Sequence, residues 1–153
     1  MRVVGLVVIS ALLLTLAGCT GTRLFGGDGV GGPCLEEHDA TAARLRQNEM
    51  VTDVIPPGAV PGEVWVIKPC DDEGYFGGVE IRMSGADGGM PRTRAFYRAE
   101  AAKRGWEPKD GRGDGLCFEH PDEPDVLLLV NSVSDDTFSV MLAFGPRPWT
   151  CAT

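Results

Sequence analysis

Five cysteines and two histidines are the side chains of this 153-residue sequence best suited to covalent or metal chemistry. Cys19 directly follows an apolar run, and the other four cysteines lie further along the chain, at Cys34, Cys70, Cys117 and Cys151. A thiol at the end of an apolar leader can take a lipid as a thioether. An even number of thiols in an exported domain is typical of disulfides. The residue types therefore indicate acylation and oxidation as the main chemistry.

The first nineteen residues have the organisation of a signal peptide that ends in a lipid-modified cysteine. Residues 3–17 carry no charge, and Leu16-Ala17-Gly18-Cys19 resembles the bacterial lipobox. The run is shorter than the ~20 residues of a membrane-spanning helix, so a permanent transmembrane anchor is the less favoured alternative. We expect residues 1–18 to be removed and lipid on Cys19 to hold the chain on the extracytoplasmic face of the cell membrane.

Composition divides the remaining chain into a Gly-rich tether at residues 19–33, beginning at the lipidated cysteine, and a single domain at residues 34–153. Without residues 1–18 the chain has 13 basic and 22 acidic side chains, a balance of −9. This charge disfavours nucleic acid as a partner, because such binding depends on neutralised phosphates. It also gives no general attraction to anionic lipid head groups, so the lipid is the expected membrane contact.

Two helices are predicted from the periodicity of apolar residues. The first covers residues 35–51, and its buried stripe is expected to hold Leu35, Ala42, Leu45 and Val51. The second covers Arg92–Arg104 and ends at Gly105. Its expected stripe contains Ala95, Ala99, Ala102 and Trp106, with Phe96 beside it.

Five strands are predicted at Glu63–Lys68, Val79–Met83, Leu116–His120, Val126–Val130 and Thr137–Phe144. In the last of these, Phe138, Val140, Leu142 and Phe144 are expected to face inward. The order is helix, two strands, helix, three strands. This order predicts one small α+β domain with a mostly antiparallel sheet and helices on one face.

The four cysteines of the domain allow three pairings, and their spacing alone does not decide among them. A helical crossover that made the second and third strands parallel would bring Cys70 and Cys117 to the same edge of the sheet. Geometry then favours Cys70–Cys117, with Cys34–Cys151 by elimination, while the other two pairings stay open. Zinc is less favoured, since none of the four lies in a Cys-x-x-Cys pair.

Candidate catalytic and metal-binding residues are few, and we expect no metal, no cofactor and no enzyme activity. His38 lies among acidic residues in the first helix and is expected to be exposed. His120 lies in the acidic, proline-containing segment from Glu119 to Asp125, where carboxylates suit a divalent cation. Ligand spacing for such a site is absent, so a solvated hairpin loop is the favoured interpretation.

Basic side chains are concentrated in and after the second helix, whereas the rest of the domain is acidic. A solvated helix face is the simpler interpretation of this cluster. The alternative is a docking surface for an acidic partner or for lipid head groups. The residues of this surface would be Arg92, Arg94, Arg98 and Arg104.

Several short motifs resemble those of small actinobacterial lipoproteins. Phe96-Tyr97, Gly105-Trp106 and Cys117-Phe118 are followed by a closing pair of apolar strands, and the upstream features are Pro56-Pro57-Gly58-Ala59 and Pro69-Cys70-Asp71-Asp72. The likeness covers roughly residues 45–145 and rests on structural motifs. It implies the fold and the location, and it implies no activity.

Together these features predict a lipid-anchored cell-envelope protein that acts as a non-catalytic binding or interaction module, with a protein or other envelope component as its unspecified partner. One alternative is an envelope hydrolase or metal-dependent enzyme whose site the sequence does not reveal. Another is a purely structural lipoprotein. A pocket that gathers two or more ionisable groups would favour the enzyme, whereas polar groups scattered over the surface would count against it.

Overall fold

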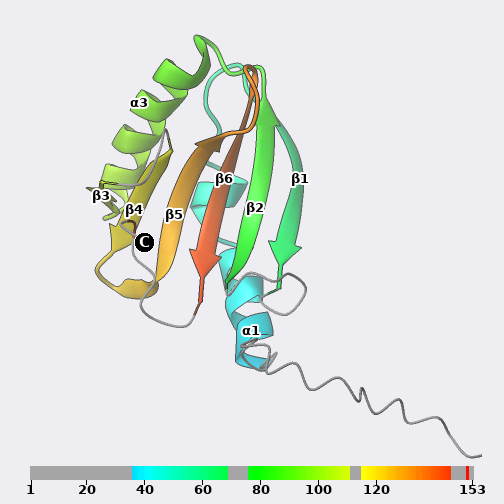
Figure 1. Ribbon diagram of the computed structural model, residues 1–153, viewed down its shortest axis with the longest axis vertical. Coiled ribbons are helices and arrows are strands. Elements are labelled where there is room, and N and C mark those ends of the chain that lie inside the picture. The colour runs from blue at the N-terminus through cyan, green and yellow to red at the C-terminus, as the bar shows by residue number, and fades with distance from the viewer. Residues whose placement is uncertain (1–35, 69–75, 111–114, 146–150, 152–153) are drawn as a thin grey trace, which may run out of the picture.

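A single six-stranded sheet organises the computed structural model, which describes residues 36–68, 76–110, 115–145 and 151 (Figure 1). Its strands lie in the order β1 (Val60–Ile67), β2 (Gly77–Ser84), β6 (Thr137–Phe144), β5 (Glu123–Ser132), β4 (Leu116–His120) and β3 (Glu107–Lys109). Every neighbouring pair is antiparallel. The predicted α+β class with an antiparallel sheet is confirmed. The predicted signal peptide, the tether, Cys19, Cys34 and Cys70 lie outside the described residues.

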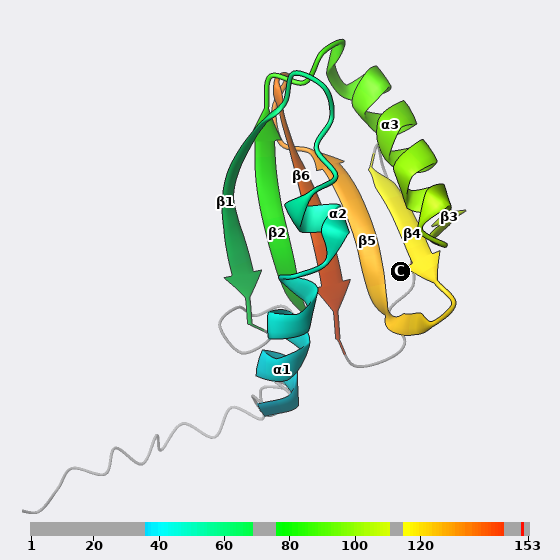
Figure 2. The same ribbon diagram turned by 180° about the vertical axis from the view of Figure 1, so that it is seen from behind.

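Within the described residues, three helices lie on one face of the sheet: α1 (Glu36–Leu45), α2 (Glu49–Thr52) and α3 (Gly89–Lys103) (Figure 2). The single helix predicted for residues 35–51 is wrong, because the chain turns after Leu45 and restarts at Asn48. The Asn48 side chain accepts a hydrogen bond from the Met50 amide at 2.9 Å and so caps the N-terminus of α2. The predicted burial of Ala42, Leu45 and Val51 is confirmed, and Leu35 lies outside the described residues.

The buried side of α3 differs from the predicted alanine stripe. Ala95, Ala99 and Ala102 are exposed, and the helix instead buries Thr93, Tyr97 and Ala101. The Thr93 hydroxyl donates a hydrogen bond to the carbonyl of Gly89 at 3.0 Å, and the Tyr97 hydroxyl donates one to the carbonyl of Val54 at 2.8 Å. With their polar atoms satisfied, these side chains can enter the core, where the tyrosine ring buries far more apolar area than an alanine methyl.

The five predicted strands are all present, and the alternation in two of them is confirmed. Val79, Ile81 and Met83 of β2 face the helices. In β6, Phe138, Val140, Leu142 and Phe144 face the same way. The sequence missed β3, because its three residues are exposed and include a proline. The helical crossover predicted after the second strand therefore returns to β3, which runs parallel to β2, and not to β4.

The central strands are apolar on the opposite face of the sheet as well. Leu127 of β5 and Ala143 of β6 are register partners there, and both are buried. Met141 of β6 is also buried, with its side chain over Gly78 of β2. This second apolar surface continues to Cys117 of β4, whose register partner is Leu129. We call it the outer face, because no described helix covers it (Figure 1).

The disulfide in the described part of the chain joins Cys117 to Cys151, with a Cα–Cα distance of 5.6 Å. The predicted pairs Cys70–Cys117 and Cys34–Cys151 are therefore wrong. The prediction needed β2 and β4 to be parallel neighbours. Instead β6 and β5 lie between them, and three antiparallel pairings in succession make them run in opposite directions. Cys151 packs on the outer face beside Leu127 and closes a loop with a sequence separation of 34.

Tyr97→Phe tests how α3 is held. Burial raises the pKa of the Tyr97 hydroxyl, so the folded chain keeps a proton that the unfolded chain releases above about pH 10. Above pH 10, the free energy of unfolding should therefore fall more steeply with pH in the wild type than in Tyr97→Phe. The difference between the two slopes should reach up to about 1.4 kcal/mol per pH unit. At pH 7 the variant should lose about 1–3 kcal/mol, because the Val54 carbonyl is left buried without its partner.

Urea unfolding at pH 7 and between pH 9 and 11 measures both effects, and lysine titration is common to both proteins. Tyr75→Phe, the same change at the only other tyrosine of the sequence, measures how much that second phenol contributes to the alkaline slope. Equal alkaline slopes for wild type and Tyr97→Phe would contradict the burial of the hydroxyl.

Candidate functional site

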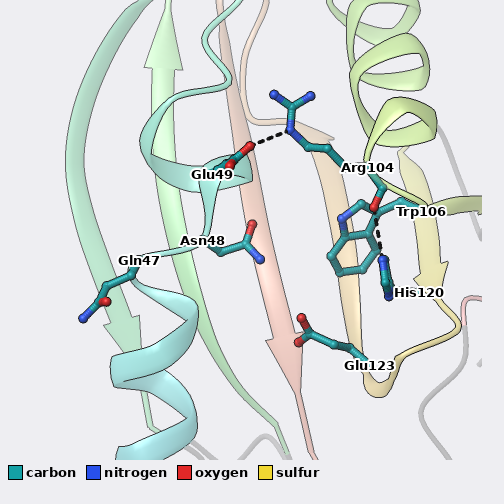
Figure 3. A pocket seen from close by; sticks show the side chains of 7 residues that line it. All are labelled: Gln47, Asn48, Glu49, Arg104, Trp106, His120 and Glu123. Carbon is teal, nitrogen blue, oxygen red and sulfur yellow. Dashed lines mark hydrogen bonds and ion pairs between the residues drawn. The ribbon is translucent and has the colours of Figure 1, made fainter.

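A cleft of about 330 Å³ opens where α1, α2, the end of α3 and the β4–β5 hairpin meet (Figure 3). Its lining residues come from three segments: Gln47, Asn48 and Glu49; Arg104 and Trp106; and His120 and Glu123. Their convergence follows from local structure. The break between α1 and α2 exposes the first segment, and Gly105 turns the chain at the end of α3 so that Trp106 enters the core.

Gly105 is needed at this turn for two reasons. Its φ of +80° lies in the left-handed region, which side chains with a Cβ rarely adopt. A Cβ at this position would also lie only 3.0 Å from Nε2 of His120. The prediction that Gly105 ends the helix is confirmed, and the position also sets how close His120 lies to α3.

His120 is fixed through both of its ring nitrogens. Nδ1 accepts a hydrogen bond from the Asp122 amide at 3.2 Å, and Nε2 lies 3.1 Å from the carbonyl of Arg104. Because an amide can only donate and a carbonyl can only accept, this arrangement requires the neutral tautomer with the proton on Nε2. The ring also makes an edge contact with Trp106 at a centroid distance of 5.2 Å. His120 therefore acts here as a spacer between α3 and the hairpin.

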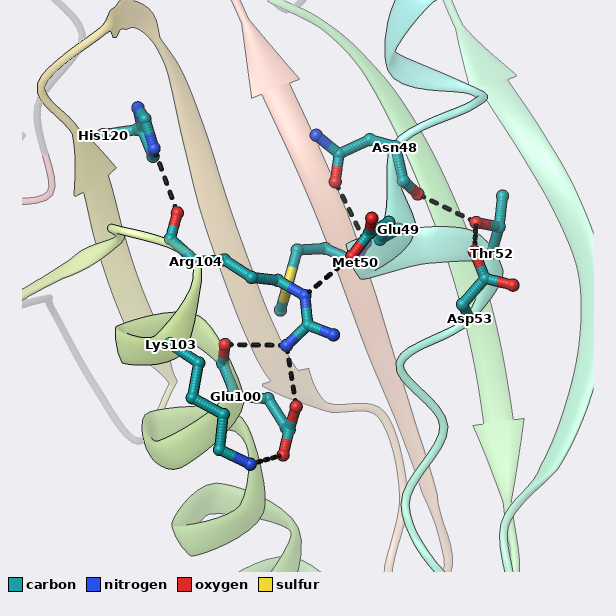
Figure 4. Close-up of polar contacts among 9 residues, drawn as sticks. All are labelled: Asn48, Glu49, Met50, Thr52, Asp53, Glu100, Lys103, Arg104 and His120. Atoms are coloured by element: carbon teal, nitrogen blue, oxygen red, sulfur yellow. Dashed lines mark hydrogen bonds and ion pairs between the residues drawn. The ribbon is translucent and has the colours of Figure 1, made fainter.

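Arg104 links α3 to α2 at the rim of the cleft (Figure 4). Its Nε donates to Glu49 at 3.1 Å, and its Nη1 donates to the Glu100 carboxylate at 2.7 Å and to the Glu100 carbonyl at 3.0 Å. The hydrogen bond to Glu100 is the main cause of the raised pKa of Arg104. Hydrogen bonds from Lys103 and Arg104 correspondingly lower the pKa of Glu100. The charges at this rim thus neutralise one another.

Glu123, on the opposite side of the cleft, is also paired. It accepts a hydrogen bond from Arg44 of α1 at 2.6 Å, which ties the β4–β5 hairpin to that helix. The cleft therefore gathers the four ionisable groups Glu49, Arg104, His120 and Glu123, as the enzyme alternative requires. Each of the four has a partner in the fold, and none of the seven lining residues is a serine, threonine, cysteine or lysine. What the arrangement offers chemically is hydrogen bonding to a polar ligand.

The metal site considered at His120 finds no support in the geometry around it. Both ring nitrogens are already in hydrogen bonds, and Glu123 is paired with Arg44. In the described ranges, no group of three or more His, Cys, Asp and Glu side chains is placed to hold a metal ion. The predicted solvated loop is accurate for Pro121 and Asp122, which are exposed, but His120 itself is half-buried.

The four arginines of the alternative docking surface are not equivalent. Arg92 and Arg98 are exposed, Arg94 is half-buried with its Nε atom buried, and Arg104 belongs to the cleft. Arg92 and Arg94 lie two residues apart and so about 160° apart around the helix. Arg94 therefore departs from the solvated helix face that was the simpler interpretation of this cluster. His38 was likewise expected to be exposed, but it is half-buried, with its ring centroid 6.0 Å from that of Phe144.

Sequence reasoning found some residues of the cleft and missed others. Trp106, Arg104 and His120 stood out because of their type or their place at a helix end. Gln47, Asn48 and Glu49 were missed, because they were assigned to the interior of one continuous helix. The signal that would have found them is Asn48 itself, since asparagine is a preferred N-cap and is unfavourable within a helix.

Comparison with known proteins gives no match to a family model, to a curated protein or to a solved structure. Residues 36–68, 76–110, 115–145 and 151 contain no helix that combines the length and the apolar character needed to cross a membrane.

Trp106→Ala tests whether the floor of the cleft is part of the core. The ring is only 4% exposed, so its removal should lower the free energy of unfolding by about 3–5 kcal/mol in urea denaturation. The matched control is Trp65→Ala, since Trp65 is 59% exposed and should lose less than about 1 kcal/mol. Similar losses at the two tryptophans would contradict this assignment.

Proposed function

We propose that this chain is a lipid-anchored protein of the cell envelope whose domain acts outside the cytoplasm as a non-catalytic binding module. The observation that carries the location is the Cys117–Cys151 disulfide, because structural disulfides form and persist in oxidising compartments. It is independent of the leader sequence, and it agrees with the lipobox-like Leu16-Ala17-Gly18-Cys19.

The position of α1 supports the anchoring part of the proposal. The helix begins at Glu36, at the end of the domain furthest from the β2–α3 connection (Figure 1). A tether between Cys19 and this helix would attach the domain at its α1 end without fixing its orientation to the bilayer. A Gly-rich chain of that length spans roughly 20 Å, enough to separate the domain from the head groups.

The paired state of the cleft supports binding over catalysis. A general base must be able to take a proton. Nδ1 of His120 already accepts a hydrogen bond from an amide, and both carboxylates of the cleft are paired with arginines. The hydrolase alternative draws its support from the convergence of four ionisable groups in one cleft. It would need these pairs to open when a substrate binds.

Cys19→Ala tests the anchor. Without the thiol no thioether forms, so the variant should move from the membrane fraction to the soluble fraction, or remain unprocessed with residues 1–18 attached. Cell fractionation with immunoblotting and intact mass spectrometry measure both results. Cys151→Ala is the matched control, because it removes another cysteine and should leave the protein in the membrane. A Cys19→Ala protein that has lost residues 1–18 and still stays in the membrane fraction, or a wild type that retains residues 1–18, would refute the proposal.

A further inference from the structure

β1 forms one edge of the sheet and is unusually apolar for an edge strand. It lies at the end of the strand order, so among the described elements only β2 pairs with it (Figures 1 and 2). Three of its side chains are large, apolar and exposed: Val60 is 65% exposed, Trp65 59% and Val66 38%. An exposed apolar edge presents unpaired backbone groups and is a template for another strand.

The edge is protected in its first half only. Pro61 lacks an amide hydrogen, and the register between β1 and β2 shifts between Pro61 and Val64. Proline and such bulges are the usual means of blocking an edge. From Val64 to Ile67 the register with β2 is unbroken, and all four residues are apolar: Val64, Trp65, Val66 and Ile67. The second half of β1 is therefore a regular strand without these protections.

We propose that this segment pairs antiparallel with the same segment of a second copy, about a two-fold axis at Val66. Residues opposite each other in an antiparallel ladder lie on the same face of the sheet, so a symmetric pairing must be centred on one residue. A centre at Val66 keeps the ladder, which then runs from Val64 to Lys68, clear of the bulge. Trp65 then lies opposite Ile67 of the second copy on the outer face, twice over, as an aromatic and β-branched pair.

The position of α1 favours a second copy as the occupant. Lys68, next to the end of β1, forms an ion pair with Asp39 of α1 at 3.0 Å. Pairing centred on Val66 therefore brings the α1 helices of both copies close to the two-fold axis. The chains that precede Glu36 would leave the dimer near its middle, where both can reach one membrane.

Confinement to one membrane would also raise the effective concentration of the two edges. This part of the argument rests on the proposed lipid anchor, whereas the pairing of the edges does not. The contact is small. Two tryptophans contribute at most ~150–250 Å² each, so the total falls at the low end of specific interfaces. We therefore expect a reversible dimer whose population depends on concentration.

Sedimentation equilibrium of the full chain in detergent micelles tests the proposal, between about 1 μM and 1 mM. The protein mass should rise from that of one processed chain to that of two. Val66→Lys should weaken dimerisation about tenfold or more, because it places two lysines opposite each other at the axis. Val60→Lys and Val133→Lys are matched controls at exposed valines outside the paired segment and should dimerise like the wild type.

A second variant keeps the test independent of any folding defect in Val66→Lys. Val66→Cys should form a disulfide-linked dimer on oxidation, whereas Val60→Cys should not. A wild type that stays at the mass of one chain over the whole range overturns the proposal. So does a Val66→Lys variant that dimerises like the wild type, or a Val66→Cys variant that crosslinks to a different protein in intact cells. The distribution of Cys19→Ala between fractions tests the anchor separately.

Discussion

The central strands β5 and β6 present apolar side chains on both faces of the sheet, and each face must therefore be removed from water. Helices cover one face, where Leu128 and Leu142 are fully buried beneath them. On the outer face Leu127 and Ala143 are buried as well, although no described helix lies there. The covalent link from Cys117 to Cys151 holds Cys151 against this face. β1 lies furthest from this link, and its apolar edge stays exposed.

Covering the inner face with short helices explains the polar contacts between them. α2 has only four residues and is too short to be stable alone, so its position depends on tertiary contacts. Met50 and Val51 anchor it in the core, and Arg104 of α3 reaches its first residue, Glu49. The Tyr97 hydroxyl donates a hydrogen bond to the carbonyl of Val54, just after the end of α2. The cleft is the space between these contacts and the β4–β5 hairpin. Its charged groups are paired because they are the same groups that hold the helices and the hairpin together.

The sequence predicted the strands better than the helices, for a physical reason. Apolar residues recur at every second position along β6, a period that is typical of strands and not of helices. The bounds of β6 and its inward residues were therefore predicted from the pattern alone. The buried side of α3 was misassigned because it contains two polar residues, Thr93 and Tyr97. Each can be buried because its hydroxyl donates to a carbonyl, that of Gly89 in the same helix for Thr93 and that of Val54, far along the chain, for Tyr97. The cysteine pairing failed because it depends on strand order, which no local pattern encodes, and because β3 was too short and polar to be recognised.

In the proposed function, the disulfide between Cys117 of β4 and Cys151 completes a domain that acts outside the cytoplasm. Peptide mapping without reduction tests it most directly, on wild-type protein taken from cells lysed in the presence of a thiol-alkylating reagent. We predict a linked pair of peptides that contain Cys117 and Cys151, with neither cysteine alkylated. Alkylated Cys117 and Cys151 in the native protein, or a linkage of Cys117 to Cys34 or Cys70, would contradict the account.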